Sequence, residues 1–203
     1  MIYISSLTSG SWPWYTARGT GFAGLALLAG LIIGGIGHAT GLTYKFIEPV
    51  KAWAIHKAMG VMLLVDVVLH MLALFFDSFV SFSIVNIIVP FTSSYSNGST
   101  LMRVSLGSFA VASGVIAMYG IAIVVASSLG WIDTKKSIWR KLHYLSYAVL
   151  PLVLIHALGT GSDLKEGEGA RILMIILLLA MIVAIVSRLV RTSGKSRETK
   201  IGN

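Results

Sequence analysis

Five long runs of apolar residues alternate with short polar segments along the chain, and this pattern predicts five transmembrane helices. A helix needs about 17–25 residues to cross a hydrocarbon core about 30 Å thick. The runs that meet this length are 20–37, 53–76, 104–132, 142–158 and 172–190. A shorter apolar stretch, 79–90, ends at a proline, and we interpret it as an interfacial or re-entrant segment.

Composition supports an all-α integral membrane protein. Of the 203 residues, 56% are hydrophobic and 12% are charged, whereas a soluble domain has about 45–50% apolar and about 25% charged residues. The absence of cysteine excludes disulfides, iron–sulfur clusters and thiolate-bound metals. We therefore expect an extracytoplasmic segment over 1–19, a transmembrane bundle of about five helices over 20–190 and a polar cytoplasmic tail over 191–203.

The net charge of +8 carries topological information, because the basic residues lie at the ends of the apolar runs. Twelve of the sixteen lie on one side of the predicted membrane: Lys45, Lys51, Lys57, Lys135, Lys136, Arg140, Lys141, Arg188, Arg191, Lys195, Arg197 and Lys200. The positive-inside rule then predicts a multi-pass protein of the cell (inner) membrane, with its N-terminus outside and its C-terminus in the cytoplasm. Membrane lipid, rather than nucleic acid, is the expected surrounding partner.

Two of the predicted helices each carry a pair of histidines, His56 with His70 and His143 with His156. Ionisable side chains inside membrane helices are costly and mark functional sites. Thirteen residues separate the first pair and twelve the second, so each pair spans about 20 Å along its helix at ~1.5 Å per residue. One histidine of each pair is therefore expected near the cytoplasmic face and the other near the outer face.

The two histidine-bearing helices run in the same direction, because one helix lies between them in sequence. His56 then lies level with His143, and His70 with His156. Two levels of two imidazoles predict two sites, each binding one haem iron through two axial histidines. Six-coordinate haems of this kind suit electron transfer rather than ligand activation.

Helical phase supports the first pair more directly than the second. Fourteen steps of ~100° leave His56 and His70 about 40° apart, whereas thirteen steps leave His143 and His156 about 140° apart. Pro151 lies between His143 and His156, and a proline inside a helix kinks it. We therefore predict a bend at Pro151 that turns His156 toward the same side as His143.

Other interpretations of these polar residues stay open. A single histidine in a membrane helix can be a hydrogen-bonded packing residue, although four in matched pairs are harder to explain in this way. A zinc site would need a shared level and carboxylate partners, which the pattern lacks. His38 has no matched partner and is interpreted as interfacial. Asp66 could orient a ligand, relay a proton or form a hydrogen bond between helices.

Motifs around the histidines are similar to those of one family. They are Trp14-Tyr15-x-x-Arg18, Phe76-Asp77-Ser78-Phe79, Val89-Pro90-Phe91, Trp139-Arg140-Lys141-Leu142-His143-Tyr144-Leu145-Ser146-Tyr147 and His156-Ala157-Leu158-x-x-Gly161-Ser162-Asp163, together with the two histidine spacings. The chain resembles, from about Trp14 to Val190, the ferric reductase-like transmembrane domain, the haem-carrying membrane part of ferric reductases and NADPH oxidases. It is most similar to short bacterial members without a fused reductase domain.

The resemblance implies two b-type haems, the inner one bound by His56 and His143 and the outer one by His70 and His156. Larger family members have six helices and carry flavin- and nicotinamide-binding domains that reduce the haems. This chain is expected to lack the first helix and those domains. The resemblance therefore implies an oxidoreductase component that needs a separate flavin-containing reductase, or a quinol, as its electron donor.

Haem propionates are anionic and need cations or hydrogen-bond donors. Arg18 and Arg103 are the basic residues that adjoin the outer ends of the first and third helices, and they are candidates for the outer haem. Lys57, Arg140 and Lys141 flank the inner histidines and are candidates for the inner haem. The positions of Arg18 and Arg103 are explained equally well if their side chains extend to the membrane–water interface. The positive-inside rule alone would account for the positions of Lys57, Arg140 and Lys141.

Three functions compete at this stage. The leading hypothesis is a transmembrane electron conduit that passes electrons from a cytoplasmic donor to ferric iron, dioxygen or a redox protein outside. The second is a haem-bearing anchor or assembly subunit of a larger respiratory or reductase complex. The third is a cofactor-free transporter, which would need more intramembrane polar groups than Asp66 and the histidines provide.

Overall fold

The computed structural model describes residues 11–96, 100–101, 104–161 and 167–201, and these residues are almost entirely helical. The long helices are α2 (Trp12–Thr40), α3 (Pro49–Phe76), α5 (Leu106–Gly130), α7 (Leu145–Thr160) and α9 (Glu168–Ile201). Shorter elements are η1 (Thr43–Lys45), α4 (Ile84–Ile88), β1 (Thr100–Leu101), β2 (Val104–Ser105) and α6 (Lys136–His143).

Five segments of the described chain are long and apolar enough to cross a membrane, which confirms the predicted number of spans. They are Trp12–Thr40, Pro49–Phe76, Leu106–Gly130, Lys136–Thr160 and Arg171–Arg188. The fourth span consists of α6 and α7 together. The protein is therefore a multi-pass membrane protein with five candidate spans.

The predicted start of the first helix at residue 20 was wrong, because α2 begins at Trp12. The first helical hydrogen bond runs from the Tyr15 N–H to the Ser11 carbonyl at 3.2 Å. Pro13 is tolerated in the first turn, where a missing N–H costs nothing. Trp12, Trp14 and Tyr15 suit a membrane–water interface, so the helix extends beyond the strictly apolar run. Residues 1–10 lie outside the described part of the chain.

The polar segment predicted as a tail continues the last helix, since α9 runs to Ile201.

The short apolar stretch before Pro90 forms α4, which ends one residue before Val89. Ser83 and Asn86 close α4 with a reciprocal capping box, in which the Asn86 N–H donates to Ser83 Oγ and the Ser83 N–H donates to Asn86 Oδ1.

The chain groups into two compact units, Met1–Leu25 with Leu63–Glu166 and Ala26–Met62 with Gly167–Asn203. Helices α2 and α3 each pass from one unit into the other, so each contributes residues to both.

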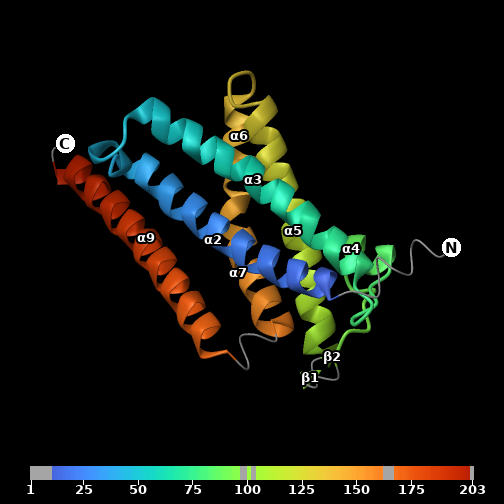
Figure 1. Ribbon diagram of the computed structural model, residues 1–203. Coiled ribbons are helices and arrows are strands. Elements are labelled where there is room, and N and C mark those ends of the chain that lie inside the picture. The colour runs from blue at the N-terminus through green and yellow to red at the C-terminus, as the bar shows by residue number, and fades with distance from the viewer. Residues whose placement is uncertain (1–10, 97–99, 102–103, 162–166, 202–203) are drawn as a thin grey trace. The chain divides into compact units, whose positions relative to one another are not determined.

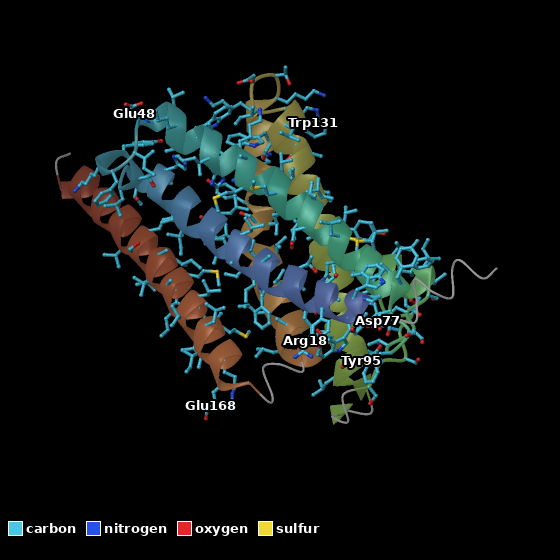
Figure 2. All side chains as sticks on the ribbon, in the orientation of Figure 1. Arg18, Glu48, Asp77, Tyr95, Trp131 and Glu168 are labelled. Atoms are coloured by element: carbon cyan, nitrogen blue, oxygen red, sulfur yellow. The ribbon has the colours of Figure 1, made fainter. Side chains whose placement is uncertain are left out.

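The first unit is built around the packing of α5 against α7, with α6 joining them (Figure 1). Small residues let the two helices approach closely, as in many membrane bundles. A Cβ at Gly120 of α5 would lie 2.6 Å from Val149 Cγ2, and a Cβ at Gly159 of α7 would collide with the Cβ of Ala110. Figure 2 shows Arg18, Asp77 and Tyr95 toward one end of this unit and Trp131 at the other.

A pair of two-residue strands precedes α5 in the same unit. Thr100 pairs with Ser105 and Leu101 with Val104 in antiparallel register. In the loop after α3, the buried Asp77 accepts a hydrogen bond from the Phe79 N–H at 2.9 Å. Ser108 of α5 donates to the Ser93 carbonyl at 2.6 Å, and this contact connects the loop to the start of α5.

The second unit contains the later part of α2, the earlier part of α3, and α9. Glycines again allow close contact between α2 and α3. A Cβ at Gly30 would lie 2.5 Å from Met59 Cε of α3. Gly37 instead lies against η1, where an added Cβ would collide with Thr43 Oγ1. Met174 and Met181 of α9 are buried. Glu48 and Glu168 lie at opposite ends of this unit (Figure 2).

The fourth span has a break that the sequence did not predict. Helix α6 ends at His143, and α7 begins at Leu145. The Tyr147 N–H donates to the Tyr144 carbonyl at 3.1 Å, a three-residue spacing tighter than that of an α-helix. Pro151 lies inside α7, so the bend predicted there stays a prediction. The break at Tyr144 therefore interrupts the helix between His143 and His156, in addition to the proline inside α7.

Candidate functional site

His70 of α3 and His156 of α7 face each other within the first unit. Their ring centroids are 6.2 Å apart, and the ring planes cross at 82°. The two residues are 86 positions apart in sequence, so the packing of the unit brings them together. Both side chains are half-buried. This pair corresponds to the outer level predicted from the sequence.

Hydrogen bonds to main-chain carbonyls fix the proton of each imidazole. His70 Nδ1 lies 2.9 Å from the Ala17 carbonyl, and His156 Nδ1 lies 3.0 Å from the Ala110 carbonyl. A carbonyl can only accept, so both Nδ1 atoms carry the proton and donate. The lone pair of a neutral imidazole then resides on Nε2. Both histidines therefore present a metal-binding nitrogen.

A threonine hydroxyl adds a second acceptor for His70. Thr20 Oγ1 lies 3.1 Å from His70 Nδ1 and donates its own proton to the Thr16 carbonyl at 2.7 Å. Because that proton is already used, the hydroxyl can only accept from His70. Such partners orient a ligating imidazole and raise its basicity.

The distance between the rings fits one metal ion held between them. Two imidazoles bound through Nε2 on opposite sides of a metal, at a metal–nitrogen distance of about 2 Å, have ring centres about 6 Å apart. Glycines leave room for the rings. A Cβ at Gly114 would collide with the His156 ring, and a Cβ at Gly21 would lie 3.8 Å from His70 Cε1.

The donor set also indicates what kind of metal group suits the pair. Among the described residues, no group of three or more His, Cys, Asp or Glu side chains converges on one point. Tetrahedral zinc requires at least three protein ligands. Two opposed imidazoles instead suit a metal that brings its own equatorial ligands, as haem iron does. The residues of this level therefore fit a haem.

His56 of α3 lies in the second unit against the glycines of α2. A Cβ at Gly34 would lie 3.7 Å from His56 Nδ1, and a Cβ at Gly35 would lie 3.4 Å from His56 Cε1. The His38 ring packs edge-on against His56, with centroids 5.5 Å apart and ring planes at 88°. His56 thus packs against the glycines of α2 on one side and has the His38 ring as an aromatic neighbour.

The hydrogen bonds of His38 differ from those of His70 and His156. His38 Nε2 lies 3.2 Å from the Ala52 carbonyl, so Nε2 donates, and Nδ1 lies 3.3 Å from the Tyr44 hydroxyl. Both nitrogens are engaged, and neither is left to bind a metal. His38 is a packing residue that contacts His56, which is more specific than the interfacial role expected from sequence.

His143 of α6 lies in the first unit beside Ser128 of α5. His143 Nδ1 is 3.3 Å from Ser128 Oγ, which also accepts from Trp139 Nε1–H at 3.1 Å. The Ser128 proton is donated to the Val124 carbonyl at 2.7 Å. Nδ1 of His143 must therefore be the donor, and Nε2 presents its lone pair. His56 and His143 belong to different units, and their predicted pairing stays a prediction.

The candidate propionate partners have diverse surroundings. Arg18 is half-buried, with its guanidinium carbon 3.9 Å from the Trp14 ring centroid, and it directly follows Ala17, the acceptor for His70. Arg103 lies outside the described residues. Lys57 Nζ lies 5.2 Å from the Trp53 ring centroid. Arg140 and Lys141 line a cavity of about 380 Å³ on α6 together with Lys136, Ser137 and Tyr144.

Sequence reasoning did not identify the residues that support the histidines. Ala17 and Ala110 act through their carbonyls, which carry no side-chain signal. Ser128 and Thr20 could have been suspected as small polar residues within apolar spans. Gly114 could have been suspected as a small residue in an apolar span, but its contact with His156 depends on tertiary packing.

One comparison with known proteins identifies the chain's family. The sequence profile described as "Ferric reductase like transmembrane component" matches residues 19–154. The match includes His56, His70 and His143 and stops two residues before His156. No curated protein and no solved structure matches the chain.

Proposed function

Because the chain belongs to the ferric reductase-like transmembrane family, we propose that it transfers electrons across the membrane through two b-type haems. His70 and His156 bind the outer haem iron, and His56 and His143 bind the inner one. The observation that carries this proposal is the pair of opposed imidazoles 6.2 Å apart, each with its Nδ1 proton held by a main-chain carbonyl.

A bound haem supplies a one-electron iron couple. The residues of the chain would provide its environment: the neutral imidazoles would hold the iron, and ligation by two histidines suits electron transfer. The Ala17 and Ala110 carbonyls and the Ser128 hydroxyl hold the Nδ1 protons of His70, His156 and His143. Arg18 on the outer side, and Arg140 with Lys141 on the inner side, would pair with the haem propionates.

The direction of electron flow follows from the charge distribution. The basic cavity on α6 lies at the end of the fourth span where His143 is located. The positive-inside rule assigns this end to the cytoplasm. A separate flavoprotein or a quinol therefore donates electrons at the His143 level, and ferric iron, dioxygen or a redox protein accepts them at the His156 level.

The test is a reduced-minus-oxidised absorption spectrum of the purified protein, with haem and protein quantified on the same sample. We expect a b-type spectrum and two haems per chain. His70→Ala and His156→Ala should each remove about one haem, and the same holds for His56→Ala and His143→Ala, because an iron that loses one axial ligand is held less tightly.

His38→Ala is the matched control for these variants. Both nitrogens of His38 are engaged by Ala52 and Tyr44, so this variant should retain two haems. The proposal is wrong if the purified protein binds no haem, or if the His56→Ala/His143→Ala double variant retains two haems per chain.

A further inference from the structure

Asp66 is an acidic side chain within helix α3, one turn before His70. It lies in the span Pro49–Phe76, and four positions along a helix correspond to about 6 Å of rise. An ionised carboxyl inside the membrane is costly unless it has a partner or a function. Asp66 is not among the residues proposed to bind the haems.

The carboxyl of Asp66 packs against the backbone of α2. A Cβ at Gly24 would lie 2.7 Å from Asp66 Oδ2 and 3.8 Å from its Cγ, and the same Cβ would lie 3.8 Å from Leu63 Cδ1. An alanine at position 24 would therefore require the Asp66 carboxyl to shift. The Asp66 side chain is half-buried. Gly24, which it contacts on α2, lies one turn beyond Thr20 and Gly21, which contact His70.

Asp66 forms no hydrogen bond or ion pair with any described residue. It therefore differs from Asp77, whose carboxylate accepts from the Phe79 N–H. Besides Asp66, few titratable or charged side chains lie on the long helices of the first unit. They are Tyr15 and Arg18 of α2, His70 of α3, Tyr119 of α5, and Tyr147 and His156 of α7.

Adding an electron one helical turn away changes the energetics of this carboxyl. Two charges interact far more strongly in the membrane interior than in water, because the dielectric constant is low. A carboxylate near a centre that gains negative charge is destabilised, and protonation relieves that repulsion. By linkage, proton binding then favours reduction to the same extent that reduction favours proton binding.

We propose that Asp66 is a redox-linked proton-binding site. When one electron arrives at the His70–His156 level, the Asp66 carboxylate takes one proton from water and becomes a carboxylic acid. When that electron leaves, the acid releases the proton. One electron and one proton enter together, so the membrane interior gains no net charge. This inference rests on the proposed function, since it requires a redox centre between His70 and His156.

The first test measures the midpoint potential of the outer haem against pH in the purified protein. In the wild type the potential should fall as pH rises through the range in which Asp66 titrates, because protonation favours reduction. Asp66→Asn keeps the shape but cannot ionise, so its potential should stay constant over that range. Asp133→Asn, at an exposed position outside the spans, should keep the wild-type pH dependence.

A second measurement follows the carboxyl itself. The infrared difference spectrum between reduced and oxidised protein should contain the C=O stretching band of a protonated carboxylic acid. This band should vanish in Asp66→Asn and shift in Asp66→Glu, and proton uptake on reduction should fall in Asp66→Asn.

The inference and the proposed function fail in different ways. If no haem is bound, the proposed function is wrong. If Asp66→Asn binds two haems and keeps both the pH dependence and the infrared band of the wild type, Asp66 is not the proton site and the electron-transfer role is unaffected.

Discussion

At the scale of single residues, the hydrogen-bond partner of each imidazole separates the proposed metal-binding histidines from the packing histidine His38. His70, His156 and His143 donate from Nδ1 and keep a lone pair on Nε2. His38 donates from Nε2 and uses Nδ1 to accept from the Tyr44 hydroxyl. The same side chain is therefore a candidate ligand or a packing group according to which nitrogen carries its proton.

Gly114→Ala tests the space around His156. The added Cβ would collide with the imidazole ring, and a ring displaced from its carbonyl acceptor cannot keep its position over the metal. Because overpacking forces such shifts, we expect about half of the bound haem to be lost. The haem-to-protein ratio measures this loss.

Gly130→Ala is the control for that prediction. Gly130 lies in the same helix, α5, and a Cβ there would meet nothing within 4 Å. This variant should bind haem as the wild type does. Full haem content in Gly114→Ala would show that the close contact with His156 does not constrain the ligand.

At the scale of helices, the sequence predicted the number of spans and the location of the histidines on them. Both follow from local properties, namely apolar length and residue spacing. The beginning of α2 was missed because Trp12, Trp14 and Tyr15 are interfacial residues that an apolar run leaves out. The break at Tyr144 was missed because no proline or glycine marks it. The acceptors Ala17 and Ala110 could not be predicted, since they depend on which helices pack together.

Ser128→Ala tests the connection between α5 and α6. The serine accepts from both His143 Nδ1–H and Trp139 Nε1–H, so its loss leaves two donors without this acceptor. A buried donor that loses its partner costs about 1–3 kcal/mol. We expect the affinity of the inner haem to fall ~10-fold to 100-fold, the usual effect of losing a ligand's supporting bond. Haem titration of the depleted protein measures it.

Ser127→Ala is the matched control on the same turn of α5. Its hydroxyl donates to the Val124 carbonyl, and no hydrogen bond to a described histidine is found. Haem affinity should stay at the wild-type value in this variant. Equal affinities in both alanine variants would contradict the role assigned to Ser128.

At the scale of the whole molecule, the orientation in the membrane determines the side from which electrons enter. The chain has no cysteine, so a single introduced thiol reports its own side. Ser137→Cys lies on α6 beside the basic cavity, and Ser78→Cys follows the end of α3. Both positions are exposed.

We expect a membrane-impermeant maleimide to label Ser78→Cys in intact cells and to label Ser137→Cys only after the membrane is opened. This outcome follows from the excess of basic residues on the side of α6. The opposite labelling pattern would reverse the orientation and place the electron donor outside.

The main-chain acceptors of His70 and His156 limit how this protein can change over evolution. A substitution at position 17 or 110 replaces a side chain but leaves the carbonyl that holds the imidazole. These two hydrogen bonds are thus inherited with the helix packing, and a point mutation removes them only by disturbing that packing, as a larger side chain at the buried position 110 would. The Ser128 hydroxyl, by contrast, can be removed by one substitution. Variation among descendants of this chain should therefore adjust the surroundings of His143 more readily than those of His70 and His156.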